Sequence, residues 1–251
     1  MAQYVAVANL KGGVGKSTIA VNLACALSSR SKRTVLVDAD RQGTSTFWGA
    51  SGALPVETWP LPLEDVGSAN TGWLARVLTG SRSPEYERAR TWLARLREID
   101  ASYVVVDCPP HVGLATRAAI TAADLTVVPV TGTAADLAAT SPAMRLIREV
   151  RQTRYDQGPD CLVVPSRIDR GTASGRKVEH LLRQFGEPLG PVISQRCAFA
   201  DSLAFGQWVG DYAPGSRAYQ EIASLALRVK RVLSRSSREQ SQKRALAPSK
   251  H

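Results

Sequence analysis

The chain has 251 residues, of which 44% are hydrophobic and 22% are charged. This length and apolar content are enough for a sizeable core and exclude disorder as the main state. Lys and Arg number 32 against 22 Asp and Glu, so the formal net charge is +10. A surplus of this size favours a polyanionic partner, either nucleic acid or an anionic membrane surface.

Short apolar runs along the chain predict the strands of one sheet. They lie at residues 4–9, 34–37, 103–106, 125–130 and 161–164. Their nearly continuous hydrophobicity is typical of parallel strands that helices cover on both faces. Helices are predicted near residues 16–29, 84–97, 113–122, 133–150, 173–185 and 216–233. The fold class is therefore α/β, with a doubly wound, mostly parallel sheet flanked by helices in a single domain.

Two segments depart from this alternation. Residues 51–70 contain three prolines and little periodicity, which predicts an irregular excursion. From Arg228 to the end there are eight basic residues and one acid, and residues 234–251 have almost nothing to bury. We therefore expect one domain over residues 1–233, followed by a basic, disordered tail over 234–251.

The four cysteines are far apart in the sequence, with no C-x-x-C pair. No secretory signal precedes the first strand, and no apolar run approaches the roughly 18 residues of a spanning helix, so we expect a protein of the reduced cytosol. Cys108 is interpreted as a small packing residue. The tryptophans Trp59, Trp73 and Trp92 serve either helix packing or the docking of a partner.

A glycine-rich segment lies directly between the first predicted strand and the first predicted helix. It consists of Lys11, Gly12, Gly13, Val14, Gly15, Lys16, Ser17 and Thr18. Glycines let the backbone curl so that its N–H groups and the helix N-terminus converge on one point, where a polyphosphate is favoured. Lys16 is placed to reach the β- and γ-phosphates, and the Ser17 hydroxyl to ligate Mg²⁺. The segment predicts a phosphate loop; a chance glycine-rich turn is the alternative.

The loop departs from the usual G-x-x-x-x-G-K-[ST] pattern, because the first glycine would fall at Leu10 and a second lysine, Lys11, follows it. It resembles the K-G-G-x-G-K-[ST] loop of the ParA/MinD family of ATPases, especially the short ParA-type partition and positioning ATPases, including McdA-like proteins. The resemblance implies a P-loop NTPase fold, the cofactors ATP and Mg²⁺, and a homodimer when ATP is bound. It also implies that Lys11 reaches the partner's nucleotide phosphates; a solvated loop lysine is the alternative.

Three aspartates follow predicted strands. Asp38 and Asp40 come after 34–37, and Asp107 ends 103–106. The carboxyl ends of parallel strands are where ligands of open α/β sheets bind. Asp107 has the Walker B position, which holds Mg²⁺. The resemblance assigns the attacking water to Asp40 and a supporting role at the metal to Asp38, whereas capping of segment 42–48 is the alternative for both.

The resemblance weakens after residue 160. Ser166 and Arg167 stand where relatives carry residues near the adenine, which makes them candidates for the purine pocket; an ordinary strand-end turn is the alternative. Arg196 and Arg217 match places where ParA arginines contribute to nonspecific DNA binding, and Lys230 and Arg231 join them by charge alone. Solvated surface cations are the alternative for all four.

The resemblance to the ParA/MinD family implies a cytoplasmic, nucleoid-associated ATPase that is Mg²⁺-dependent and slow without its partner. It would dimerise with ATP, bind double-stranded DNA nonspecifically, and position a partition complex or a protein body such as a carboxysome. A small cargo-adaptor protein would stimulate hydrolysis and release. The main alternative is a MinD-like membrane-surface ATPase, but after Leu233 only Leu246 is large and apolar, so no stable membrane association is expected. A reductase like the nitrogenase iron protein and a purely structural nucleotide-binding module are further alternatives.

Overall fold

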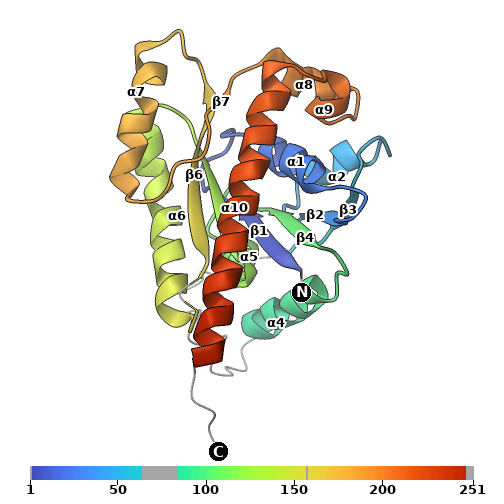
Figure 1. The fold of residues 1–251 in the computed structure, drawn as a ribbon, viewed down its shortest axis with the longest axis vertical. Coiled ribbons are helices and arrows are strands. Elements are labelled where there is room, and N and C mark those ends of the chain that lie inside the picture. Colours follow the sequence, from blue (N-terminus) through green and yellow to red (C-terminus); the bar gives the residue numbers. More distant parts are fainter. Residues whose placement is uncertain (1, 64–83, 157, 247–251) are drawn as a thin grey trace, which may run out of the picture.

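The computed structural model of the protein describes residues 2–63, 84–156 and 158–246. It contains a seven-stranded sheet in the order β3-β2-β4-β1-β5-β6-β7, in which every paired neighbour is parallel (Figure 1). The strands are β1 Gln3–Val7, β2 Thr34–Asp38, β3 Glu57–Pro60, β4 Tyr103–Asp107, β5 Leu125–Val130, β6 Asp160–Ile168 and β7 Ile193–Ser194. The predicted α/β class with a doubly wound parallel sheet is confirmed.

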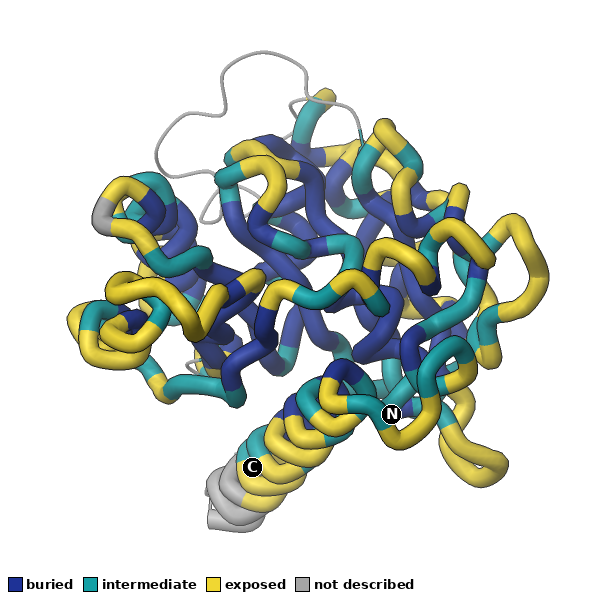
Figure 2. The backbone as a smooth tube through the Cα atoms, turned by 90° about the horizontal axis from the view of Figure 1, so that it is seen from above, coloured by how far each residue is buried: buried dark blue, intermediate teal, exposed yellow. Residues whose placement is uncertain are grey.

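Helices cover both faces of the sheet. One core layer joins the sheet to α4 Pro84–Arg97, α5 Leu114–Ala122, α6 Ala134–Thr153 and α7 Ala173–Leu182, the last followed by the 3-10 helix η1 Arg183–Phe185. The other joins it to α1 Lys16–Leu27, α2 Thr44–Gly49, α8 Cys197–Ala204, α9 Val209–Tyr212 and α10 Arg217–Leu246. Successive strand residues alternate between the layers: Ala6 packs in the first and Val5 in the second. Figure 2 shows the buried segments gathered through the middle of the molecule.

The central strand β1 marks the point where the strand order reverses. Its neighbours are β4 on one side and β5 on the other, and the chain crosses β1 when it passes from β4 to β5. In open α/β sheets, ligands bind outside the carboxyl ends of the strands at such a switch point. The predicted phosphate loop, which follows β1, lies at this position.

Two sequence predictions are corrected here. The segment 51–70 is not wholly irregular, because residues 57–60 form the edge strand β3 beside β2. The tail is not disordered from residue 234, because α10 continues to Leu246; residues 247–251 lie outside the described part of the chain. No described helix combines the length and apolar character needed to cross a membrane.

The tryptophans of this region have different environments. Trp92 is buried in α4 and its Nε1 donates to the carbonyl of Leu61 at 2.8 Å, so it serves packing. Trp59 on β3 is 41% exposed. Trp73 lies outside the described residues.

Candidate nucleotide site at the carboxyl edge of the sheet

The loop between β1 and α1 has glycines where its backbone requires them. Gly13 and Gly15 have φ angles of +74° and +89°, in the left-handed region that side chains other than glycine rarely adopt. A Cβ on Gly15 would also lie 2.9 Å from Ser166 Oγ. No side chain caps the N-terminus of α1, and its first turn has no acidic residue. The helix therefore presents its first N–H groups and its positive dipole end to an anion.

Lys16, the first residue of α1, is held inside this loop. Its side chain is 7% exposed, and its Nζ donates to the carbonyl of Lys11 at 3.1 Å. Burial lowers the pKa of Lys16, and the nearby carboxylates of Asp107 and Asp40 oppose this shift. The cation thus lies between the loop backbone and the carboxylates at the ends of β2 and β4.

Asp107 ends β4 and is buried. Ser45 Oγ donates to its Oδ2 at 2.7 Å, whereas its buried Oδ1 has no hydrogen-bond partner. Burial raises the pKa of Asp107 to about 7, against the effect of the Ser17 and Ser45 hydroxyls and of Lys16. An unsatisfied carboxylate oxygen beside a hydroxyl is a donor set that suits a hard divalent cation.

The residues present therefore fit Mg²⁺, and Asp107 and Ser17 are the side chains that would hold it. The described residues contain no group of three or more His, Cys, Asp or Glu that could enclose a metal ion. Mg²⁺ is commonly held by one or two carboxylates together with phosphate and water.

Asp38, at the end of β2, accepts hydrogen bonds from the adjacent helix α2. Its Oδ2 accepts from the backbone N–H and the hydroxyl of Thr46 at 2.7 and 2.9 Å, and its Oδ1 accepts from the N–H of Asp40 at 3.1 Å. Burial raises the pKa of Asp38, and the bonds from Thr46 oppose this shift. The capping alternative thus describes the contacts of Asp38, which orders the first turn of α2.

Asp40 lies two residues beyond β2 and is half-buried. Its Oδ1 accepts from the N–H of Gln42 at 3.0 Å, and its carbonyl accepts from Gly43 at 3.0 Å. This turn keeps the carboxylate at the edge where the phosphate loop lies. The negative charge of Asp40 there acts to raise the pKa of Lys16.

Lys11 forms an ion pair with Asp136 at the start of α6. Asp136 also closes a capping box with Thr133, in which each side chain bonds to the other's backbone N–H. Burial alone would raise the pKa of Asp136, but Lys11, Thr131 and Thr133 hold it at about 2. The Lys11 side chain remains 41% exposed.

Ser166 and Arg167 lie within β6 rather than in a turn after it, so that alternative is wrong. Ser166 Oγ donates to the carbonyl of Val14 at 2.7 Å, and Arg167 Nη1 donates to the carbonyl of Gly13 at 2.6 Å. Both residues therefore contact the phosphate loop itself.

Several residues that hold the predicted site residues in place were not predicted from the sequence. Asn9 is buried and bonds to Pro129, to Thr140 and to the N–H of Lys11, so it anchors the start of the loop. Ser45, Thr46 and Asp136 bond to predicted site residues, as described above. The T-x-x-D spacing at Thr133 signals a capping box, but no local pattern pairs Asp136 with Lys11.

The cysteines do not form a cluster. Cys25, Cys108 and Cys161 are buried and Cys197 is exposed. Cys108 packs in the core beside α5, and burial raises the pKa of its thiol, which confirms its packing role.

The candidate DNA-binding residues have different environments. Arg196 is engaged with Glu221, with Nη2 and Oε1 2.7 Å apart. Arg217 and Arg231 are exposed on α10, and Lys230 is half-buried. The four residues therefore do not form one equivalent set.

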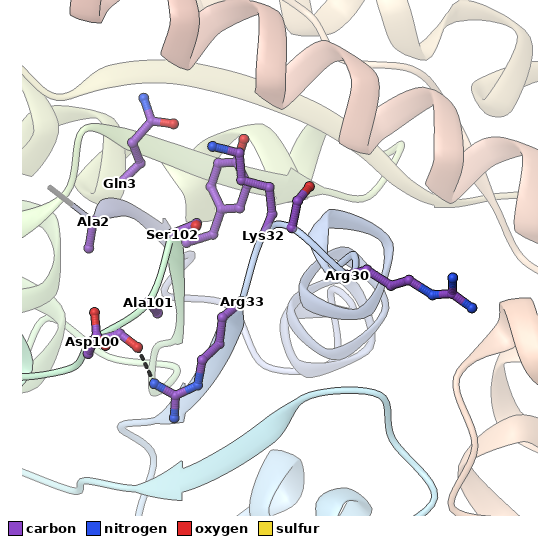
Figure 3. A pocket seen from close by; sticks show the side chains of 10 residues that line it. Ala2, Gln3, Arg30, Lys32, Arg33, Asp100, Ala101 and Ser102 are labelled. Carbon is purple, nitrogen blue, oxygen red and sulfur yellow. Dashed lines mark hydrogen bonds between the residues drawn. The ribbon is translucent and has the colours of Figure 1, made fainter.

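A separate cavity of about 530 Å³ lies at the amino edge of the sheet (Figure 3). Its lining includes Gln3, Arg30, Lys32, Arg33 and Asp100. Arg33 is already bonded to the Asp100 carbonyl and to Glu57, the latter at 2.8 Å. Because it lies at the opposite ends of the strands from the phosphate loop, this cavity is not the nucleotide site.

The sheet topology, the loop at the N-terminus of α1 and the carboxylate of Asp107 define a P-loop nucleotide-binding domain. Residues 5–209 match the family described as the CobQ/CobB/MinD/ParA nucleotide binding domain. The chain belongs to this family, within which it is similar to ParA- and McdA-type partition or positioning ATPases.

Two relatives and one solved structure illustrate the similarity. The maintenance of carboxysome distribution protein A of Gloeobacter kilaueensis is 33% identical over 230 residues, covering 88% of this chain and 92% of the relative. The chromosome partitioning protein ParA of Caulobacter vibrioides is 30% identical over 246 residues, with coverage of 88% and 92%. The septum site-determining protein MinD of Pyrococcus horikoshii, complexed with Mg-ADP, has a TM-score of 0.68 at 17% identity, covering 94% of this chain and 99% of that one.

Proposed function

We propose that the chain is a Mg²⁺-dependent ATPase that dimerises around ATP, binds DNA without sequence preference and positions a cargo. The observation that carries the proposal is the pair of lysines on one phosphate loop: Lys16 is buried inside it, and Lys11 stays 41% exposed. One cation is placed for its own nucleotide, and the other is accessible to a second subunit. Hydrolysis then depends on assembly, which links ATP turnover to every property of the dimer.

Each side chain at the carboxyl edge has a role in hydrolysis. Lys16 and the N-terminus of α1 hold the phosphates, and Asp107 with Ser17 would hold Mg²⁺. When bound, Mg²⁺ supplies positive charge that neutralises charge developing on the phosphate oxygens. Asp40, half-buried at this edge, orients the attacking water. Phosphoryl transfer to water requires little more than such positioning and electrostatic stabilisation.

The DNA surface that we propose is a line of arginines on α10. Arg217, Arg228, Arg231, Arg235 and Arg238 are all exposed. With 3.6 residues per turn, they fall within an arc of about 80° on the helix, over a length of about 32 Å. We call these five residues the α10 arginine stripe. Closely spaced arginines along one helix suit the phosphates of a duplex, which they can contact without reading bases.

Two earlier candidates do not join this surface. Arg196 bonds to Glu221 through both Nε and Nη2, so its charge is already compensated. Lys230 is half-buried and, by the same helical geometry, lies about 120° around α10 from the middle of the stripe. Arg217 and Arg231 remain candidates, and the other three stripe arginines join them.

The MinD-like alternative conflicts with the position of α10. Ile222, Leu225, Val229 and Leu233 of this helix are buried against the sheet, and Leu227 alone among the large apolar residues of its described part is half exposed. Their burial leaves arginines rather than an apolar face outside, and insertion into lipid needs an apolar face.

The cargo is inferred from the relatives. The carboxysome distribution protein and the chromosome partitioning protein are similar over most of this chain, which supports a large cargo recognised through an adaptor. We propose that this adaptor stimulates hydrolysis and thereby releases the dimer from nucleoid DNA in the cytoplasm.

The test measures ATP turnover and co-sedimentation of the purified protein with unrelated duplex DNA or with anionic liposomes, each with ATP, with ADP and without nucleotide. ATP-dependent retention on DNA that falls steeply with salt supports the proposal. ATP-dependent retention on liposomes with none on DNA would establish the MinD-like alternative instead. Nucleotide binding without any turnover, even with DNA present, would favour a structural module.

A further inference from the structure

The end of β6 holds the phosphate loop through two backbone carbonyls. Ser166 Oγ bonds to the carbonyl of Val14 and Arg167 Nη1 to that of Gly13, at 2.7 and 2.6 Å. The partners are 152 and 154 residues apart in sequence, so β6 reaches the loop only because the sheet places β6 near β1. Ser166 is buried, whereas Arg167 is exposed and extends its guanidinium over the loop.

The backbone at this place is unusual. Arg167 has a φ angle of 55°, and among the described residues no other non-glycine residue has a positive φ. The pairing of β6 with β7 is irregular between Ser166 and Ile168, as at a β-bulge. Bulges re-aim side chains, and non-glycine residues in the left-handed region concentrate at functional sites. Here the irregularity turns Arg167 toward Gly13.

The two bonds set the orientation of the loop. In a trans peptide unit the C=O of one residue and the N–H of the next point in opposite directions. Fixing the carbonyls of Gly13 and Val14 toward β6 therefore directs the N–H groups of Val14 and Gly15 away from β6. These N–H groups belong to the phosphate loop, whose function is to present N–H groups to an anion.

The packing around Gly15 supports the same conclusion. A Cβ there would lie 2.9 Å from Ser166 Oγ and 3.7 Å from Arg167 Cγ, so the two strand residues occupy the space beside Gly15 that a side chain would need. Contact on this scale leaves the loop little room to change conformation while both side chains are in place.

We propose that Ser166 and Arg167 are positioning residues for the phosphate loop, and that they act on phosphate binding rather than on recognition of the purine. The proposal rests on the proposed nucleotide-dependent function. It replaces the sequence-based assignment of these residues to a purine pocket with a role in orienting backbone N–H groups.

The experiment compares ADP with inorganic pyrophosphate, which shares the phosphates and lacks the nucleoside. Affinities for both, with Mg²⁺ present, are measured by calorimetry for the wild type and for R167A, R167G, R167K and S166A. R170A, an exposed arginine three residues away, is the matched control. Thermal unfolding without ligand confirms that each variant is folded.

We expect R167A and S166A to lose about tenfold in affinity for both ligands by the same factor, since a lost hydrogen bond from a charged group or a buried hydroxyl is of this order. R167K should recover part of the loss because it can still donate to the Gly13 carbonyl. R167G keeps the left-handed backbone, so a loss equal to that of R167A assigns the effect to the guanidinium. R170A should match the wild type.

A loss for ADP with pyrophosphate unchanged would overturn the proposal in favour of purine contact, and unchanged affinity for both would overturn it outright. Failure of the proposed function is distinguishable, because it appears as an absence of nucleotide binding or turnover in the wild type. Failure of the inference appears only in the ratio of the variant's affinity to the wild-type affinity for ADP and pyrophosphate.

Discussion

The ammonium of Lys11 is paired with the carboxylate of Asp136, a residue 125 positions later in the chain. The pair joins the phosphate loop to the N-terminus of α6. Asp136 is 2% exposed and Lys11 is 41% exposed, so the acid is buried and the lysine is accessible from outside. A cation proposed to act on a partner's nucleotide is thus paired with an acid of its own subunit.

Replacing Asp136 with Asn should change stability with a definite pH dependence. The folded-state pKa of Asp136, about 2, is below its ordinary value of 3.8, so its carboxylate stabilises the fold above about pH 4. This contribution is lost as the pH falls from about 4 to 2. We expect D136N to be less stable than the wild type by up to about 2 kcal/mol at neutral pH, with the difference shrinking below pH 4.

Urea denaturation of both proteins between pH 2 and pH 7 measures this difference. T133A, which loses the other half of the capping box but keeps the ion pair, is the control. A difference between D136N and wild type that stays constant down to pH 2 would contradict the assigned pKa.

Lys11 and Lys16 should be separable by experiment. K16A removes the buried cation of the loop, and we expect loss of nucleotide binding by at least about tenfold. K11A should still bind ATP, because Lys11 is paired with Asp136 rather than buried in the loop. It should fail to form the ATP-dependent dimer and to be retained on DNA, as measured by light scattering and DNA co-sedimentation. ATP-dependent dimers of K11A would remove the proposed trans role.

Asp40 should matter for hydrolysis alone. We expect D40A to bind ATP, dimerise and stay on DNA while its turnover falls at least about a hundredfold, since it loses the residue that positions water. Rapid quench of ATP hydrolysis measures the chemical step directly. Unchanged turnover in D40A would remove Asp40 as the water-positioning residue.

Replacing Asp107 with Asn should raise the stability of the fold and weaken the binding of Mg²⁺. Its folded-state pKa of about 7 is raised by burial, so the protonated form is favoured in the fold. Without Mg²⁺, this residue stabilises the fold below about pH 4, and the contribution disappears as the pH rises to about 7. D107N should therefore be more stable than the wild type at pH 8 in EDTA, by on the order of 4 kcal/mol.

The same substitution should weaken Mg²⁺-dependent nucleotide binding, because a neutral amide is a poorer ligand than a carboxylate. Denaturation in EDTA and titration with Mg-ADP give the two results on one protein. A D107N variant that is less stable than the wild type at pH 8 in EDTA would contradict the raised pKa of Asp107.

Charge reversal on the α10 arginine stripe should weaken DNA binding without loss of fold. R228E with R231E should reduce affinity for unrelated duplexes at least about tenfold at low salt and lower the salt slope by about 2, one unit for each lost phosphate contact. R176E with K177E on α7 is the matched control, because both residues are exposed on a helix of the opposite face. Equal losses in the two pairs would mean that net charge, rather than the stripe, binds DNA.

Arg196 should behave differently from the stripe. R196A leaves the partly buried carboxylate of Glu221 without its cation, so we expect a lower free energy of unfolding and little direct change in DNA affinity. The double variant R196A/E221A should recover part of the lost stability. A strong DNA defect in R196A at unchanged stability would return this residue to the DNA surface.

The sequence by itself determined five of the seven strands and the residues that follow them. Apolar runs of four to six residues are encoded locally, and so is a glycine-rich loop before a helix. Lys16, Ser17, Asp38, Asp40 and Asp107 could therefore be placed at one edge of a parallel sheet without coordinates. The short edge strand β3 could not, because Glu57–Pro60 has no apolar alternation and takes its pairing from β2.

The end of α10 shows how composition alone misleads. Residues 234–246 are polar, but Arg, Glu, Gln, Lys and Ala are good helix formers. Extending an existing helix requires no new nucleation, so α10 continues beyond Leu233, which is buried in the core. The same extension places Arg235 and Arg238 on one side of α10 as part of the arginine stripe. The sequence alone showed these residues only as part of the net positive charge.

Only the tertiary structure decided the partners of these residues. Lys11 with Asp136, Arg167 with Gly13 and Arg196 with Glu221 join different elements of the chain. Such contacts depend on the order of strands in the sheet and on a bulge in β6, which no local pattern encodes. Local chemistry along the chain specifies a phosphate loop with its carboxylates, whereas packing determines which side chains hold that loop in place.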